Sequence, residues 1–492
     1  ELGGASRVER QHNQGKLTAR ERIALLFDDG SFEELGQLAT HVYTPVTTIP
    51  NKHTPADGVV TGFGKIEGRQ AAVVAEDFTI LGGSLGINNF IKKTRMIELA
   101  QRDKLPIVWL FDGAGARTDE FIGEGLAPMH HFMDIAKLSG VTPQIAGVLG
   151  PCAGDSSLLP AMMEFIVMVE GTAMLAAGGP PLVKMGTGED VTKEELGGTD
   201  LHCRISGVAD NRAVDDADAI RQIRRYLSYM PTNTYEYPPY VEPEDSPDRR
   251  DEDLAGILPE NKRRPYDMMK IINKVVDQDS FFEIKPDFAK MMITGLARMN
   301  GHAVGIIANQ PKVMAGGKHR HFMDLCNAFH LPIIFLMDTP GVMTGPQSEK
   351  EGALRAGMTI AHSFAFARVP LLTLTIHKGF GYGAAAMGGL GAGQSTTLAW
   401  PNADFNAIPL DSGIQAAYRA LLEAADDPEA EQARLEAELG ALCGAFPAAE
   451  QMKIDDIIEP AATRPRLIQA LERAVTHRTQ APVPATRWGI LP

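Results

Sequence analysis

The feature that most constrains the fold of this chain is an internal duplication. Three segments of the first half return in the second half, in the same order and 226 to 233 residues later. The pairs are TGFGKIEG at 61–68 with TGLARMNG at 294–301, LPIVWLFD at 105–112 with LPIIFLMD at 331–338, and PQIAGVLGPCAG at 143–154 with PLLTLTIHKGFG at 370–381. Collinear repeats of this length predict two related domains in tandem rather than one enlarged core.

The region between the two copies is rich in proline and charge. Seven prolines lie in 231–265, among many acids and arginines. Because proline lacks the backbone donor that a helix or a central strand needs, this composition predicts a connection between domains. We therefore expect an N-terminal domain over 1–235, a linker over 236–265 and a C-terminal domain over 266–492.

The balance of charge narrows the class of function. The chain carries 62 acidic and 47 basic residues, and its formal net charge of −15 argues against a surface built to bind nucleic acid or anionic lipid. Its four cysteines are too widely spaced for a zinc knuckle or a disulfide framework. Apolar runs are broken by charges, glycines and prolines before they reach a membrane span of about 18 residues. We expect a soluble cytoplasmic protein that acts on small molecules, with no nucleic acid and no membrane as partner.

Within each copy, short apolar strands end in glycine-rich turns and alternate with segments of helical periodicity. Continuous apolar strands are typical of sheets that are buried on both faces, so the pattern predicts a layered α/β fold. The regions 411–445 and 465–477 have the composition of helices with a polar outer face, and we expect them at the periphery.

Two glycine-rich turns occupy matching positions in the two copies. In the first copy a strand over 143–150 leads into GPCAGDSS at 150–157, with an apolar helical stretch expected from Leu158. In the second copy the matching strand leads into GFGYGAAA at 379–386. A turn of small residues between a strand and a helix leaves backbone N–H groups free to bind an anionic oxygen. The duplication thus predicts two oxyanion holes, suited to a reaction in which two carbonyl oxygens gain negative charge.

These turns and their surroundings resemble one enzyme family over nearly the whole chain. The motifs of the first half are GGSLG at 82–86, DGAGAR at 112–117, GPCAG at 150–154 and TGEDVTKEELGG at 187–198, and those of the second half are NQP at 309–311, DTPG at 338–341, FGYG at 380–383, AWP at 399–401 and IDDIIEP at 454–460. They are similar to the carboxyltransferase β subunits of biotin-dependent acyl-CoA carboxylases of the propionyl-CoA and methylcrotonyl-CoA type. The resemblance implies two tandem crotonase-like (ClpP/crotonase) domains of the ββα superhelix type.

The resemblance also implies a reaction and the residues that would carry it out. A carboxyl group would pass from carboxybiotin to an acyl-CoA through a thioester enolate, with the acyl-CoA on the N-terminal domain and the biotin on the C-terminal domain. Gly154 and Asp155 would donate to the thioester oxygen. The biotin oxygen would be bound by Gly381, Tyr382 and Gly383. The substrate-binding residues would be Gly82, Gly83, Ser84, Gly115, Ala116, Arg117, Ala384 and Ala385.

The same resemblance implies cofactors and partners. Biotin would arrive on a separate carrier, supplied by a biotin carboxylase and biotin carboxyl carrier subunit, and the coenzyme A thioester would be the substrate. The subunit would assemble as a homo-oligomer built from dimers, commonly a hexamer. No metal is expected in this subunit, because His130, His131, His319 and His321 have no carboxylate or thiolate at ligand spacing.

Departures from the family pattern bear on the substrate and leave alternatives open. Ala385 stands where related enzymes have an aspartate that helps to set acyl preference, so we expect a branched, unsaturated or otherwise bulky acyl group. A biotin-dependent acyl-CoA decarboxylase or transcarboxylase would share both oxyanion holes. Asp155, where many relatives have a second glycine, and the altered segment 408–413 keep open a biotin-independent crotonase-like lyase or hydrolase. A catalytically silent scaffold of a carboxylase complex is the alternative outside enzymes.

Overall fold

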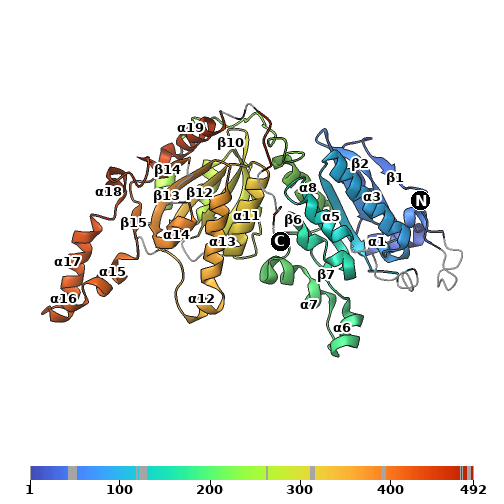
Figure 1. Ribbon diagram of the computed structural model, residues 1–492, viewed down its shortest axis with the longest axis horizontal. Coiled ribbons are helices and arrows are strands. Elements are labelled where there is room, and N and C mark those ends of the chain that lie inside the picture. Colours follow the sequence, from blue (N-terminus) through green and yellow to red (C-terminus); the bar gives the residue numbers. More distant parts are fainter. Residues whose placement is uncertain are drawn as a thin grey trace. The chain divides into compact units, whose positions relative to one another are not determined.

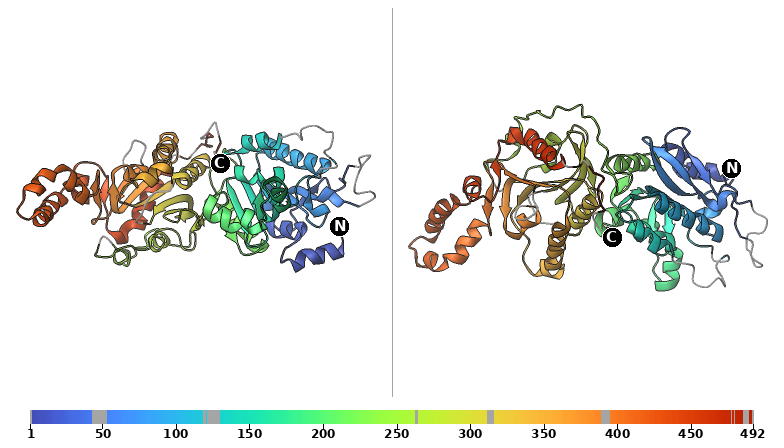
Figure 2. Two further views of the ribbon diagram at one scale, coloured as in Figure 1. Left: turned by 90° about the horizontal axis from the view of Figure 1, so that it is seen from below. Right: turned by 45° about the horizontal axis from the view of Figure 1, so that its top comes forward.

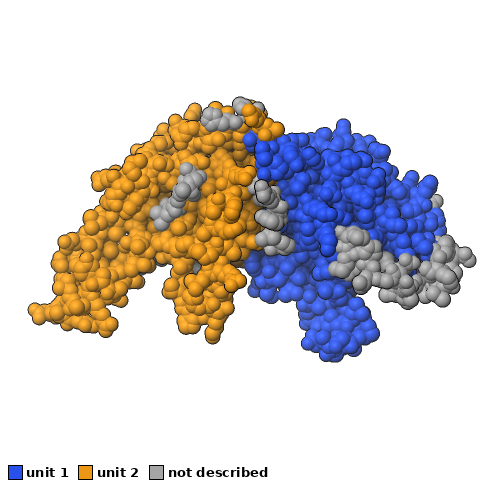
Figure 3. Space-filling view, viewed as in Figure 1, with its two compact units in different colours: residues 1–239, 285–288, 482–492 blue, residues 240–284, 289–481 orange. Residues whose placement is uncertain are grey.

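Two compact units make up the chain, and each is described by itself. The computed structural model describes residues 2–42, 53–117, 120, 130–261, 264–310, 316–388, 395–476, 478, 480–484 and 489–490, without the side chains of residues 130, 155 and 316. Unit 1 comprises Glu1–Pro239, Lys285–Phe288 and Pro482–Pro492, and unit 2 comprises Tyr240–Ile284 and Ala289–Ala481 (Figure 3).

The core of unit 1 is an eight-stranded sheet in the order β1-β2-β3-β4-β5-β6-β8, with β7 paired to β5. The strands are β1 Glu33–Leu35, β2 Val59–Ile66, β3 Arg69–Glu76, β4 Ile107–Gly113, β5 Gln144–Ala153, β6 Phe165–Val169, β7 Met174–Ala176 and β8 Asn211–Ala213. The pairs β1/β2 and β2/β3 are antiparallel, and all later pairs are parallel. Because the carboxyl ends of parallel strands meet at one edge, the loops after β4 and β5 lie close together.

The core of unit 2 repeats this arrangement in the order β16-β14-β13-β12-β11-β10-β9, with β15 paired to β13. The strands are β9 Phe282–Ile284, β10 Met292–Met299, β11 His302–Asn309, β12 Ile333–Thr339, β13 Leu371–Phe380, β14 Thr396–Ala399, β15 Asp404–Asn406 and β16 Asp456–Ile457. Strands β9, β10 and β11 pair antiparallel, and the rest pair parallel.

The strands confirm the duplication that the sequence predicts. Strands β2 and β10 are both eight residues long, as are β3 and β11, and both pairs are offset by 233 positions. Strands β4 and β12 are seven residues long with an offset of 226, and β5 and β13 are ten residues long with an offset of 227. The α/β class with two related domains is therefore correct.

Helices cover both faces of each sheet (Figure 1). In unit 1 they are α1 Ala5–Asn13, α2 Ala19–Leu26, α3 Ile87–Asp103, α5 His130–Leu138, α6 Pro180–Thr187, α7 Lys193–Gly197 and α8 Asp216–Tyr229. Helices α3 and α5 bury Met96, Ile97 and Leu138 in a core cluster with β4 and β5. On the other face Ile223 of α8 packs beside Gly147 of β5, where a side chain would meet its Cδ1 at 3.2 Å.

The helices of unit 2 include a projecting arm. They are α9 Leu254–Ile257, α10 Met268–Val275, α11 Gly316–Ala328, α12 Pro346–Lys350, α13 Ala353–Phe366, α14 Gly381–Ala386, α15 Leu410–Ala417, α16 Arg419–Ala424, α17 Pro428–Gly440, α18 Ala445–Glu450 and α19 Thr463–Val475. Helices α10 and α19 bury one face of the sheet. Helices α15 to α17 extend away from the sheet of their unit (Figures 1 and 2) and bury only Ile414 and Leu435. The expected peripheral helices in 411–445 and 465–477 are thus present.

One predicted helix is wrong. After β5 the chain forms two short 3₁₀ turns, Gly154–Ser157 and Pro160–Met162, where the sequence suggested an apolar helical stretch from Leu158. Pro160 cannot donate to the carbonyl four residues earlier, and β6 begins at Phe165, so an α-helix has neither the bond nor the length it needs.

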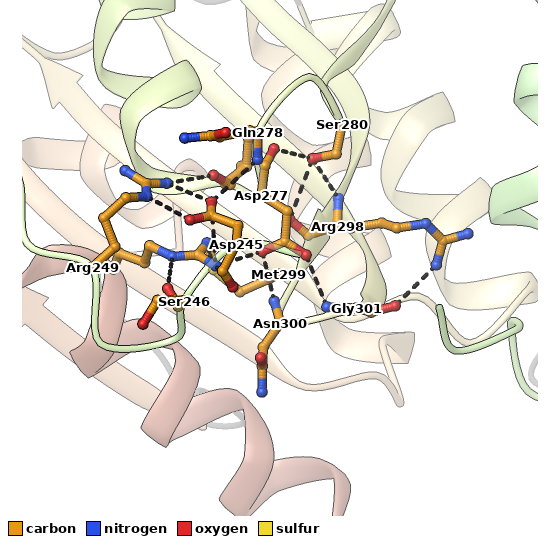
Figure 4. A network of polar contacts seen from close by, with 12 residues as sticks. Asp245, Ser246, Arg249, Asp277, Gln278, Ser280, Arg298, Met299, Asn300 and Gly301 are labelled. Atoms are coloured by element: carbon orange, nitrogen blue, oxygen red, sulfur yellow. Dashed lines mark hydrogen bonds and ion pairs between the residues drawn. The ribbon is translucent and has the colours of Figure 1, made fainter. Parts of the chain in front are cut away.

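Part of the proline-rich segment packs into unit 2 through buried charge. Arg464 of α19 is 1% exposed and donates to Asp277 at 2.7 Å and to the carbonyl of Ser246 at 3.1 Å. Asp277 also accepts the amides of Asn300 and Gly301 (Figure 4). These contacts tie the segment around Ser246 to the β10–β11 hairpin.

Among the helices of the described residues, none is long and apolar enough to span a lipid bilayer.

Candidate active site

The turn after β5 is where the sequence predicts the first of two oxyanion holes. Gly154 has a φ of +68°, a left-handed conformation that favours glycine, and a Cβ built on it would meet no atom within 4 Å. The Ser157 hydroxyl donates to the Gly154 carbonyl at 2.6 Å and closes the turn. The backbone of Asp155 lies in this turn, while its side chain is outside the described residues. The Cα face of Gly154 is therefore open to a ligand.

Two loops that the sequence proposed as substrate-binding lie side by side at the same sheet edge. The amide of Ala114 donates to the Gly82 carbonyl at 2.9 Å, and the amide of Leu85 donates to the Gly115 carbonyl at 2.8 Å. Leu85 and Ala116 form a parallel bridge. A Cβ on Gly115 would lie 3.6 Å from the Ala153 carbonyl, immediately before the first turn. The structure thus brings 82–84, 115–117 and Gly154 together.

Gly83 explains why glycine is needed in the first of these loops. A Cβ at this position would lie 2.2 Å from the carbonyl oxygen of Asp112, a distance that side chains do not tolerate. Its φ of +62° adds a backbone conformation that other residues rarely adopt. The loop that contains Gly83 can therefore pack directly against the end of β4.

Arg117 faces into the protein. Its guanidinium pairs with Asp57 at 2.6 Å and with Glu120 at 3.0 Å, and it donates to both the hydroxyl and the carbonyl of Ser84. Burial raises the pKa of the Asp57 carboxyl, and the charge of Arg117 acts against that rise. In the single chain, Arg117 therefore fixes the shape of the loop that carries Ser84.

The second turn begins at the end of β13 and leads directly into α14. Gly381 has a φ of +52°, and a Cβ on it would lie 2.5 Å from the Ala407 carbonyl. A Cβ on Gly383 would lie 2.8 Å from the backbone of Gly341 and from the Thr339 hydroxyl. The short helix α14 places its positive end at this turn. Close backbone packing thus requires glycine at both positions.

Tyr382 lies between these two glycines and anchors the turn to α13. Its hydroxyl donates to the Gly357 carbonyl at 2.5 Å, and burial raises the pKa of this hydroxyl. Tyr382 also lines a cavity of about 280 Å³ together with Met343, Leu354 and Met358. Its side chain is engaged with the protein, which leaves its backbone as the group available for an oxyanion.

The same contact between loop and turn recurs in both units. In unit 2 a Cβ on Gly341 would lie 3.8 Å from the Phe380 carbonyl, as one on Gly115 would lie 3.6 Å from the Ala153 carbonyl in unit 1. These residues are equivalent in the duplication, at offsets of 226 and 227. The resemblance of the two turns therefore extends beyond their sequence.

A second and larger cavity opens beside the turn of unit 2. Its volume is about 670 Å³. Its lining is mostly apolar and consists of Met337, Gly379, Gly381, Ala384, Phe405, Asn406, Ala407, Ile408, Leu410, Gly413, Ile414, Tyr418, Leu439, Leu442, Cys443 and Lys453. The cavity thus connects Gly381 and Ala384 of the turn with the altered segment 408–413 and the helical arm.

Buried polar networks that the sequence did not single out lie beneath both turns. The carboxylate of Asp112, near the end of β4, contacts Lys16 at 2.6 Å and Arg22 at 2.9 Å. The carboxylate of Asp338, near the end of β12, contacts Tyr266 at 2.8 Å and His377 at 3.3 Å. The signal available in the sequence was that Asp112 and Asp338 close the same repeated segment.

Two of the histidines that the sequence analysis considered as metal ligands lie against aromatic rings. His131 stacks on Phe90 at a ring distance of 4.0 Å, and His319 is buried near Phe335 and Phe364. The side chain of His130 is outside the described residues. Across the described part of the chain, no three His, Cys, Asp or Glu side chains gather as metal ligands would.

Comparisons of the sequence with known proteins agree with the family resemblance of its motifs. The model of the family described as carboxyl transferase domain matches residues 10–488. A propionyl-CoA carboxylase carboxyltransferase subunit from Haloferax mediterranei is 39% identical over 98% of this chain and 94% of its own length. A methylmalonyl-CoA carboxyltransferase 12S subunit from Propionibacterium freudenreichii is 38% identical over 98% of this chain and 93% of its own length.

Solved structures agree with the sequences. A transcarboxylase 12S crystal structure, described as a hexamer with methylmalonyl-coenzyme A and methylmalonic acid bound, superposes with a TM-score of 0.91. It is 37% identical and covers all of this chain and 95% of its own. The expected crotonase-like fold in two tandem domains is thereby confirmed.

Proposed function

The chain belongs to the carboxyl transferase domain family, and we propose that it moves a carboxyl group from carboxybiotin to an acyl-CoA. It is an enzyme, the carboxyltransferase subunit of an acyl-CoA carboxylase. Three of its relatives act, by their names, on propionyl-CoA or methylmalonyl-CoA.

The observation that carries the proposal is the pair of equivalent glycine turns, one at the sheet edge of each unit. In our proposal Gly154 and Asp155 donate backbone N–H groups to the thioester oxygen as the acyl-CoA loses a proton. Gly381, Tyr382 and Gly383 do the same for the ureido oxygen of biotin. The open face at Gly154 suits an atom that must approach the backbone closely, while Gly381 and Gly383 let the second turn pack against the backbone of Ala407 and Gly341.

Biotin, when bound, supplies an activated carboxyl group. The loops 82–84 and 115–117, joined by hydrogen bonds, would hold the coenzyme A thioester against the first turn. In this arrangement the protein stabilises charge through fixed backbone dipoles and does not need a side-chain nucleophile.

The acyl preference belongs to the same proposal. Ala384 and Ala385 are small, and the cavity of about 670 Å³ beside Ala384 has a mostly apolar lining. Apolar cavities of this size accommodate drug-sized groups. These features support a branched, unsaturated or otherwise bulky acyl group.

The partners follow from the reaction. The site needs a biotin carrier charged by a biotin carboxylase, and we propose that both are separate subunits. We also propose a hexamer built from dimers, by analogy with the hexamer described for the transcarboxylase 12S structure.

A direct test combines the purified protein with a biotin carboxylase, a biotinylated carrier, ATP, labelled bicarbonate and a panel of acyl-CoA thioesters. We expect label in a malonyl-type product. In Gly383→Ala the new methyl group would press on Gly341, and we expect kcat to fall by about 100-fold or more. Gly256→Ala, where a Cβ would meet nothing within 4 Å, is the matched control. Full activity of Gly383→Ala, or no product from any thioester with a charged carrier, would refute the proposal.

Decarboxylation is the second candidate. It is favoured by a methylmalonyl-CoA decarboxylase subunit alpha from Veillonella parvula, which is 39% identical over 97% of this chain and 93% of its own length. Incubation with methylmalonyl-CoA and uncharged biotinylated carrier, without ATP, would measure transfer from the thioester to biotin. Faster transfer in this direction than in the forward direction would favour the decarboxylase.

A further inference from the structure

The two units place a buried carboxylate at the same point beneath their turns. Asp112 is the penultimate residue of β4, Asp338 is the penultimate residue of β12, and both are 0% exposed. A buried carboxylate is costly unless a cation or several hydrogen-bond donors compensate it. The two units compensate this buried carboxylate with different groups.

In unit 1 the compensation comes from permanent charges near the N-terminus. Lys16 and Arg22 contact the two oxygens of Asp112, and Gln11 donates to it at 3.0 Å. Gly150 makes room for this arrangement, because a Cβ there would lie 2.0 Å from Asp112 and 2.7 Å from the Lys16 ammonium. Two further pairs, Arg22 with Asp216 and Lys93 with Glu76, adjoin the site. Three cations thus face three anions.

In unit 2 the residue equivalent to Gly150, 227 positions later, is His377. Its Nδ1 lies 3.3 Å from Oδ2 of Asp338, so the imidazole pairs with this carboxylate as the Lys16 ammonium pairs with Asp112 in unit 1. The residue equivalent to Glu76 is the neutral Asn309, whose amide group bonds to the backbone of Asp338. Of the described side chains that contact the Asp338 carboxylate, His377 is the one that can become a cation.

The other contacts of Asp338 point toward the turn. Oδ1 accepts the backbone amide of Lys378 at 3.1 Å, immediately before Gly379 and the glycine turn. Tyr266 donates its hydroxyl to Oδ2 at 2.8 Å, and its pKa is raised by burial and by Asp338, so it stays a donor. The carboxylate therefore links the charge of His377 to the backbone that enters the turn.

We propose that His377 is a positioning residue, whose imidazole pairs with Asp338 and so holds the backbone that enters the second turn. Asp338 connects the imidazole to the amide of Lys378, so loss of the imidazole leaves the buried carboxylate with one partner fewer and weakens its hold on Lys378. In unit 1 the same support comes from Lys16 and Arg22.

Other charged and titratable groups lie around His377. In the described contacts they are Asp338 on β12, Tyr266 ahead of α10, the neighbouring Lys378, and Asp404 of β15, which pairs in register with Lys378. Tyr266 remains a hydroxyl donor to Asp338, so a substitution at His377 removes the imidazole and leaves this second donor in place.

Hydrogen exchange of the intact protein tests the inference without any assay of activity. Peptides that cover 377–388 are compared between wild type, His377→Leu and His377→Arg at one pH. We expect exchange about tenfold faster in His377→Leu than in wild type, and restored protection in His377→Arg, which keeps a donor for Asp338. Peptides over 150–157 serve as the internal control and should match in all three proteins. Equal protection of 377–388 in His377→Leu and wild type would overturn the inference.

The kinetic test rests on the proposed carboxyl transfer. His377→Leu should lose about tenfold or more in kcat with an unchanged KM for acyl-CoA, and His377→Arg should recover most of that loss. His12→Asn, at an exposed histidine 3.0 Å from Glu21, is the control. His377→Lys replaces the arginine variant if that fails to fold. An unchanged kcat in His377→Leu would reject the role in catalysis, whereas no carboxyl transfer by wild type would reject the proposed function and leave the exchange result to decide the inference.

Discussion

At the scale of single residues, Arg117 shows how a side chain from a motif that we propose to bind substrate can act on its own loop. Its guanidinium is 3% exposed and joins Asp57, Glu120 and Ser84. These partners come from three separate segments of the chain. The loops that would hold the coenzyme A thioester therefore depend on a buried cluster of charges for their shape.

Removing this cation should destabilise the protein. Arg117→Ala leaves Asp57 and Glu120 buried without a cation, and we expect a loss of about 3–5 kcal/mol in unfolding free energy. Thermal unfolding measures the loss, and calorimetric titration with an acyl-CoA measures the weaker binding that should accompany it. Arg95→Ala, which removes an exposed pair with Glu98, should change neither. An unchanged melting temperature in Arg117→Ala would contradict this role.

The sequence could predict the glycines of the site but not their support. Gly154, Gly381 and Gly383 stand in repeated turns, and small residues repeated at a strand end indicate that something must approach the backbone closely. Lys16 and Arg22, in contrast, reach Asp112 from about 90 positions away, and no spacing rule connects them. The alignment of the repeats did place His377 opposite Gly150, and that difference in size and charge was readable from the sequence alone.

At the scale of elements, the strands were the most predictable part. Strands β4, β5 and β12 are largely apolar and buried, as is typical of strands covered on both faces, while β13 is buried but carries two threonines, a histidine and a lysine. The helix expected from Leu158 failed because apolar composition alone does not show how little chain remains before the next strand. Where a helix or strand begins and ends therefore cannot be predicted without the tertiary structure.

The start of β6 carries a titratable group that should be visible in stability. Glu164 accepts the amides of Gly140 and Gln144, and burial raises its pKa to about 7. The folded protein then keeps a proton that the unfolded chain releases above about pH 4.5, so this group's contribution to stability falls as the pH rises to about 7 and stays level above it.

Glu164→Gln removes this titration while keeping an oxygen acceptor. We expect the unfolding free energy of wild type, relative to the variant, to fall by on the order of 3 kcal/mol between pH 4.5 and pH 7. Melting temperatures of both proteins across that range measure the effect. Parallel curves would show that Glu164 does not titrate in this window.

The proline-rich connection gives a second prediction at this scale. Arg464 binds Asp277 and the carbonyl of Ser246, so Arg464→Met should leave Asp277 uncompensated and cost about 3–5 kcal/mol in the stability of unit 2. Limited proteolysis near Ser246 should become faster, as seen by mass spectrometry of the fragments. Arg466→Met, which removes a half-exposed pair with Asp456, is the control and should leave cleavage unchanged.

At the scale of the whole molecule, the duplication gives one chain two equivalent turns, and in our proposal each turn binds an oxygen that becomes anionic. Each unit supplies the same strand, turn and loop contact, from Gly115 to Ala153 and from Gly341 to Phe380. The two units differ in the charges beneath the turns and in the arm of α15 to α17, which extends from unit 2. The assembly of several chains was not readable from composition and came only from the family resemblance.

The surface of α6 bears on that assembly. The helix buries none of its own residues within the single chain, and Leu182 and Met185 are 59% and 76% exposed. Exposed apolar side chains that gather on one short helix are typical of contacts between proteins. We therefore expect α6 to be covered when the subunits associate.

Light scattering should give the wild type a mass of about six times the 53.1 kDa subunit, in line with the hexamer described for the transcarboxylase 12S structure. The double substitution Leu182→Glu and Met185→Glu should lower this mass and carboxyl transfer together, because charged side chains oppose burial at an interface. Leu38→Glu, at an isolated leucine that is 94% exposed, should leave both unchanged. A full-sized oligomer in the double variant would place the contacts elsewhere on the chain, since two buried carboxylates at a subunit interface would cost more than the contact supplies.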